Sequence, residues 1–109
     1  MEKTLNFTID GKEYKLAFTR ATIIRTEDLG FNIALIYDKP IKSLTLLWRG
    51  AFLANHSSLA NEEIDALFEK IDKEGLMDAL IDIYKAPVES LFVKDGEDSP
   101  KNAVKWTVK

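Results

Sequence analysis

Two alternating runs of apolar residues around Asp10-Gly11 are the feature that most constrains the fold. Leu5, Phe7 and Ile9 alternate with polar residues before this dipeptide, and Tyr14, Leu16 and Phe18 alternate after it. Asp and Gly tolerate the positive φ values of a type I′ turn, so the pattern predicts a two-stranded β-hairpin. A lone hairpin is only marginally stable in water. Its apolar face must therefore lie on other elements of the chain.

The residues after the hairpin carry helical patterns. Thr19 is the predicted N-cap of a first helix, and Gly30 is its predicted C′ stop. Residues 31–37 are apolar and short, and both a helical turn and a strand remain open there. Residues 41–55 are apolar on nearly every side, which predicts a helix at the centre of the domain. Gly50 in its middle is unfavourable for a helix, so we expect a close approach of another backbone element there.

Two acidic amphipathic helices are predicted next. Asn61 is the expected N-cap of the first and Gly75 its expected end. The apolar stripe of the last helix runs from Met77 to Phe92 through Pro87 without losing phase. Either one helix is kinked at Pro87, or a helix stops near Lys85 and a new turn begins with Pro87 at its first position. The predicted fold class is α+β, mainly α: an N-terminal hairpin packed on about four helices.

The C-terminal residues suggest three parts of the chain: a globular domain at 1–93, a flexible linker at 94–103 and a strand or tail at 104–109. Val104, Trp106 and Val108 alternate with Lys105, Thr107 and Lys109. In one interpretation this strand folds back and becomes the third strand of the N-terminal sheet. In the other it anchors a partner by strand addition. Val104, Trp106 and Val108 are therefore the candidate partner-binding residues.

The scarcity of reactive groups argues against catalysis. The 109 residues include no cysteine and one histidine, which excludes disulfides, thiolate metal sites and cysteine nucleophiles. His56 precedes Ser57 and Ser58, but no glycine-rich elbow surrounds either serine. We interpret His56 as a residue that stabilises the end of the central helix. We expect no catalytic residues, no metal and no cofactor.

Charge is distributed unevenly along the chain. The net charge is −3, yet residues 61–98 hold 12 acidic residues against four lysines. These acids lie opposite the apolar stripes, as expected of a solvated helix face or an electrostatic docking surface. The charge balance argues against nucleic-acid binding. No apolar run resembles a signal peptide or a bilayer span, so a soluble cytoplasmic protein without membrane contact is expected.

The order of these parts resembles a known family. A hairpin and a short helix precede Leu47-Trp48-Arg49-Gly50-Ala51-Phe52-Leu53, and Asn61-Glu62-Glu63-Ile64 opens an acidic helix. Over most of residues 1–93 this layout resembles the small tail assembly chaperones of long-tailed bacteriophages and prophages.

The resemblance implies a non-enzymatic protein that binds the tape measure protein and helps recruit tail tube subunits. Such a protein acts in the host cytoplasm, is absent from the mature virion, and could self-associate on its client. The alternative from the residues is a small bacterial protein-interaction module or adaptor of unrelated role. A small hydrolase or transferase is disfavoured, since nucleophile, base and metal ligands are lacking.

Overall fold

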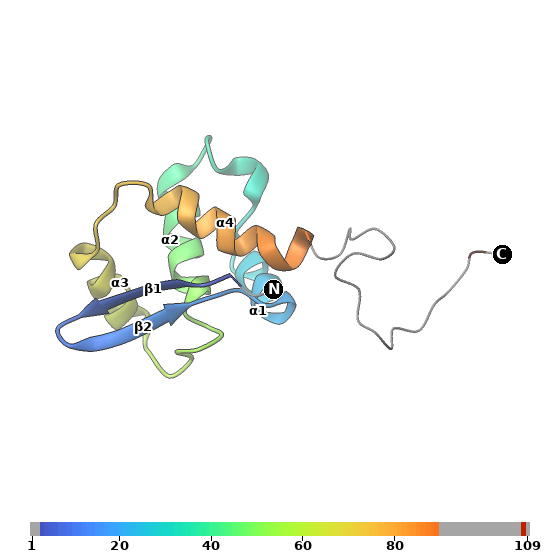
Figure 1. The fold of residues 1–109 in the computed structure, drawn as a ribbon. Helices are drawn as coiled ribbons and strands as arrows, with labels where there is room; N and C mark the ends of the chain where they lie inside the picture. The colour runs from blue at the N-terminus through green and yellow to red at the C-terminus, as the bar shows by residue number, and fades with distance from the viewer. Residues whose placement is uncertain (1–2, 90–107, 109) are drawn as a thin grey trace.

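The computed structural model describes residues 3–89 and Val108, and it shows one hairpin and four α-helices among them (Figure 1). The elements in chain order are β1 (Leu5–Ile9), β2 (Lys12–Leu16), α1 (Arg20–Asp28), the 3₁₀ helix η1 (Ile33–Leu35), α2 (Pro40–Ala51), α3 (Asn61–Lys70) and α4 (Leu76–Glu89). The predicted class, α+β and mainly α, is confirmed. The predicted linker at 94–103 lies outside the described residues, as does the predicted strand at 104–109 apart from Val108.

The hairpin has the predicted turn. β1 and β2 pair antiparallel, with Phe7 opposite Tyr14 and Leu5 opposite Leu16. Asp10 and Gly11 both have positive φ, 52° and 79°, as a type I′ turn requires. Leu16 is fully buried, so the sheet lies with one face on the helices.

Local capping sets both ends of α1. Thr19 Oγ1 accepts a hydrogen bond from the Thr22 N–H, and Thr22 Oγ1 accepts one from the Thr19 N–H. Gly30, with φ of 112°, follows the C-cap Leu29 and donates its N–H to the Glu27 carbonyl. Both predicted boundaries are confirmed. The apolar segment that follows contains a 3₁₀ turn, which decides between the two alternatives left open at 31–37.

Helix α2 runs through the middle of the molecule, with α1, α3 and α4 packed around it (Figure 1). It begins at Pro40 and ends at Ala51, whose carbonyl accepts a hydrogen bond from the Ala17 N–H. The predicted extension to residue 55 is wrong, because the chain turns back under the hairpin at this point. A close approach does occur at Gly50, but the prediction that another backbone element makes it is wrong. The side chain of Thr26 on α1 lies where a Cβ would be.

Two boundaries of the acidic helices differ from the prediction. The N-cap of α3 is Ala60, not Asn61, and the Glu63 carboxylate accepts the Ala60 N–H at 3.4 Å. Ile71 has extended backbone angles, so α3 ends at Lys70 and not at Gly75. Gly75, with φ of 72°, lies immediately before α4.

Helix α4 continues through Pro87 to Glu89, as in the first of the two alternatives considered there. None of the described helices is long and apolar enough to cross a lipid bilayer.

The core is built around Trp48. Its indole Nε1 donates to the Ile64 carbonyl at 2.7 Å, which ties α2 to α3. Its ring stacks on Phe7 and meets Phe52 and Phe68 edge-on. This cluster joins the hairpin, α2 and α3 in one apolar layer.

Candidate protein-binding surface

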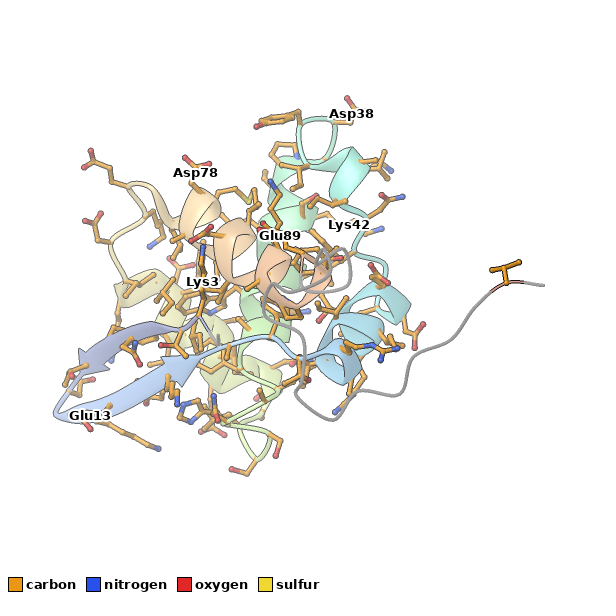
Figure 2. The ribbon with its side chains drawn as sticks, turned by 45° about the vertical axis from the view of Figure 1, so that its right-hand side comes forward. Lys3, Glu13, Asp38, Lys42, Asp78 and Glu89 are labelled. Atoms are coloured by element: carbon orange, nitrogen blue, oxygen red, sulfur yellow. The ribbon has the colours of Figure 1, made fainter. Side chains whose placement is uncertain are left out.

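Exposed apolar side chains concentrate between α1 and α2. In the described residues this region holds most of the large apolar side chains that face solvent: Leu29 (59% exposed), Ile33 (40%), Leu35 (36%), Tyr37 (92%) and Ile41 (83%). We call residues 29–41 the η1 segment. Asp38 marks its tip, at the opposite end of the molecule from Glu13 on the hairpin (Figure 2). Concentrated apolar exposure of this kind is typical of a protein-binding surface.

The η1 segment is held in place by its own buried residues. Phe31 and Ile36 are both almost fully buried, and the Phe31 ring packs edge-on against Tyr84 of α4 at 5.1 Å. The Asn32 side chain accepts a hydrogen bond from the Ala34 N–H, which starts the 3₁₀ turn. Packing in the core therefore fixes the backbone position of the η1 segment, while its other apolar side chains remain in solvent.

A groove between α2 and α3 adjoins the η1 segment. Its volume is about 410 Å³, and its lining residues from α2 include Ile41, Thr45 and Trp48. Phe68 and Glu69 line it from α3. Ile41, in the first turn of α2, belongs to both the groove and the η1 segment, so the two meet at this residue.

An ion pair joins the two walls of this groove. Arg49 Nε and Nη2 donate to the two Asp65 carboxylate oxygens at 3.0 and 2.6 Å. The hydrogen bond to Arg49 lowers the pKa of Asp65, and partial desolvation opposes this shift. The same contact raises the pKa of Arg49. Bidentate geometry of this kind constrains orientation as well as distance, so the pair adds a second polar link between α2 and α3 beside that of Trp48.

The acidic side chains of α3 and α4 lie mostly in solvent. Exposed members include Glu62 and Glu69 of α3 and Asp78 and Asp82 of α4. Within residues 3–89, no group of three His, Asp or Glu side chains is arranged to hold a metal ion. The arrangement is that of a charged helix face.

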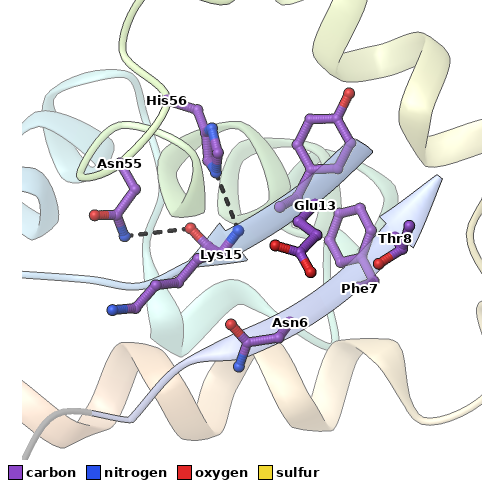
Figure 3. Close-up of a pocket in the computed structure, with 8 residues that line it drawn as sticks. Asn6, Phe7, Thr8, Glu13, Lys15, Asn55 and His56 are labelled. Atoms are coloured by element: carbon purple, nitrogen blue, oxygen red, sulfur yellow. Dashed lines mark hydrogen bonds between the residues drawn. The ribbon is translucent and has the colours of Figure 1, made fainter. Parts of the chain in front are cut away.

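His56 lines a second hollow, of about 510 Å³, against the hairpin (Figure 3). Its Nε2 accepts the backbone N–H of Lys15 at 3.0 Å, and the Asn55 amide donates to the Lys15 carbonyl at 3.2 Å. The imidazole packs between Tyr14 and Phe52. His56 therefore caps the outer edge of β2, and not the end of the central helix as the sequence suggested. No local signal could have revealed a bond across 41 residues.

Of the three candidate partner-binding residues predicted from sequence, the structure describes only Val108. Val108 is exposed, at 86%, while Val104 and Trp106 lie outside the described residues. Sequence reasoning missed the η1 segment as a site. The available signal was an apolar run between Gly30 and Pro40, too short to form a buried element of its own.

Comparison with known proteins identifies one matching family model. A family model described as "Domain of unknown function (DUF5055)" matches residues 1–109. No curated protein and no solved structure matches the chain.

Proposed function

Because this chain belongs to the DUF5055 family, whose description assigns no role, we propose a function from its own residues: a non-enzymatic phage tail assembly chaperone. It binds the tape measure protein and helps recruit tail tube subunits in the cytoplasm of the host cell. The layout of hairpin and helices that resembles such chaperones supports this proposal.

The observation that carries the proposal is the η1 segment together with the adjoining groove. A long helical client with apolar stripes needs a surface that covers those stripes until assembly. Apolar side chains from Leu29 to Ile41, followed by a groove between two helices, suit helix-in-groove recognition. Tyr37, 92% exposed, is well suited to anchor such a contact, since tyrosines are enriched at binding hot spots.

The charge of the chain supports the same role. Apart from Asp65 and Glu69, which line the groove, the acidic residues of α3 and α4 would stay in water when the apolar surface is covered. They would keep the complex soluble and attract basic segments of the client.

The test is co-expression with the tape measure protein encoded in the same phage or prophage genome. We expect the wild-type chain to keep this client soluble and to co-purify with it. Combined Tyr37→Ser and Ile41→Ser substitutions should weaken binding at least about tenfold, as expected for loss of interface anchors. Addition of the tail tube protein to the purified complex tests recruitment.

The matched control is Ile24→Ser on α1. Ile24 is also exposed, at 54%, but lies outside the η1 segment, so this variant should bind normally. All variants should keep the wild-type melting temperature. A client that is equally insoluble with and without the chain, and that forms no complex with it, would contradict the proposal.

A further inference from the structure

The two outer edges of the hairpin differ in how many of their outward backbone groups are hydrogen-bonded to the rest of the fold. In a two-residue hairpin, Ile9 and Lys12 bond each other, so the backbone groups of Glu13 and Lys15 point away from β1. At Lys15 both outward groups are occupied, by the side chains of His56 and Asn55. Two residues after Lys15, the Ala17 N–H donates to the Ala51 carbonyl. The outer edge of β2 is thus largely closed from within the molecule.

The described residues do not close the outer edge of β1 in this way, although α4 packs near this strand. By the same alternation, the backbone N–H and C=O groups of Asn6 and Thr8 point away from β2. Within the described part of the chain, no hydrogen bond occupies these outward groups. Asn6 and Thr8 are exposed residues.

β1 also lacks charged residues and proline, which usually protect an edge strand from pairing with another strand. Its sequence, Leu-Asn-Phe-Thr-Ile, contains no charge and no proline, whereas β2 carries Lys12, Glu13 and Lys15. Natural edge strands are usually protected by charge, proline, bulges or covering elements. An uncharged strand of five residues, whose outward backbone groups bond to nothing in the described residues, can accept another strand.

We propose that this edge binds β1 of a second copy of the chain, antiparallel, with Phe7 opposite Phe7 of the partner copy. In this register Asn6 of each copy faces Thr8 of the other. Each outward N–H of these two residues then donates to the facing carbonyl, so both residues are satisfied on both chains. The pairing is isologous and closed, which stops assembly at a dimer with a four-stranded sheet.

The side chains of this register are complementary. On the face toward the helices, Leu5 meets Ile9 of the partner copy on either side of the central Phe7 pair. All three side chains are only partly buried in one copy, so pairing removes more apolar surface from water. On the opposite face Asn6 meets Thr8, and no two like charges oppose each other within the strand. This self-complementarity is the reason to assign the edge to a second copy.

The test is the oligomeric state of the full chain, by sedimentation velocity and light scattering over a wide concentration range. We expect a reversible dimer. Thr8→Pro removes one outward N–H but no bond of the hairpin itself, and it should weaken dimerisation at least about tenfold. Slower hydrogen exchange at the Asn6 and Thr8 amides as concentration rises is the second expected signature.

Glu13→Pro is the matched control. Glu13 lies directly opposite Thr8, and its N–H also points outward, but from the edge of β2. It should leave dimerisation unchanged, with circular dichroism confirming that both proline variants are folded.

Three results would overturn the inference. One is a monomer at every concentration, and another is equal loss of the dimer in both proline variants. The third is loss of the dimer in Trp106→Ser, which would assign the edge to a strand from residues 104–108. Client binding is measured separately, so its failure would not affect this result.

Discussion

At the scale of single residues, Gly50 shows how one missing side chain sets a helix crossing. The side chain of Thr26 on α1 occupies the position of a Gly50 Cβ, with Thr26 Cγ2 2.8 Å from that point. Thr26 is fully buried and donates its hydroxyl to the Thr22 carbonyl at 2.7 Å, so it has little room to move. The spacing of α1 and α2 therefore depends on a glycine here.

We predict that Gly50→Ala destabilises the protein by about 1–3 kcal/mol through overpacking, although alanine favours the helix itself. Chemical denaturation measures the free energy of unfolding. Combining Gly50→Ala with Thr26→Ala should recover part of the loss, because the clashing methyl and hydroxyl are gone. An increase in stability for Gly50→Ala alone would contradict the close approach.

At the scale of elements, the segment after α2 acts as a substitute strand for β2. His56 and Asn55 supply one acceptor and one donor to Lys15, as a neighbouring strand would. The imidazole also fills space between Tyr14 and Phe52. This contact holds the hairpin on the end of the central helix.

Replacing His56 tests this contact. His56→Ala should lower the free energy of unfolding by about 1–2 kcal/mol, from the lost hydrogen bond and the lost ring packing. His56→Phe should recover only the packing part. Asn55→Ala should cost less than His56→Ala, because Asn55 is the more exposed residue and its replacement removes no ring packing. The measurement is thermal and urea unfolding. A fully stable His56→Ala variant would show that the hairpin is held by its apolar face alone.

At the scale of the whole molecule, two polar contacts between helices contain groups with shifted pKa values, so we expect stability to depend on pH. Arg49–Asp65 joins α2 to α3, and the Tyr84 hydroxyl donates to the Glu27 carboxylate at 2.7 Å, joining α4 to α1. Burial and the neighbouring Glu27 raise the pKa of Tyr84 above its ordinary value of 10.0. The ordinary pKa of Asp65 is 3.8, and it is lowered in the folded protein.

The signs of these shifts predict a stability profile that falls at both ends. Below about pH 4 the unfolded chain takes up the Asp65 proton before the folded protein does, so stability falls with falling pH. Above pH 10 the unfolded chain loses the Tyr84 proton while the folded protein keeps it, so stability falls with rising pH.

Asp65→Asn should reduce the loss of unfolding free energy at low pH by about 0.5–1 kcal/mol, the amount expected for a partly exposed ion pair. Tyr84→Phe should reduce the loss of unfolding free energy above pH 10. Melting temperatures across the pH range measure both. Unchanged slopes in both variants would mean that other groups control the profile.

The sequence by itself determined the features that depend on neighbours in the chain. Asp10-Gly11 specified a type I′ turn, Thr19 a helix start and Gly30 a helix stop, because each acts through backbone angles and bonds within a few residues. The apolar residues around Trp48 predicted a central helix, since only burial on several sides explains such a segment.

Only the tertiary structure decided where these elements meet, and with it the candidate site. The end of α2 depends on Ala17, and the role of His56 depends on Lys15, 41 residues away. Three apolar residues of the η1 segment differ in burial: Phe31 and Ile36 are buried in the core, whereas Tyr37 is exposed to water. Burial is shared among all packed elements, so no local pattern could assign it.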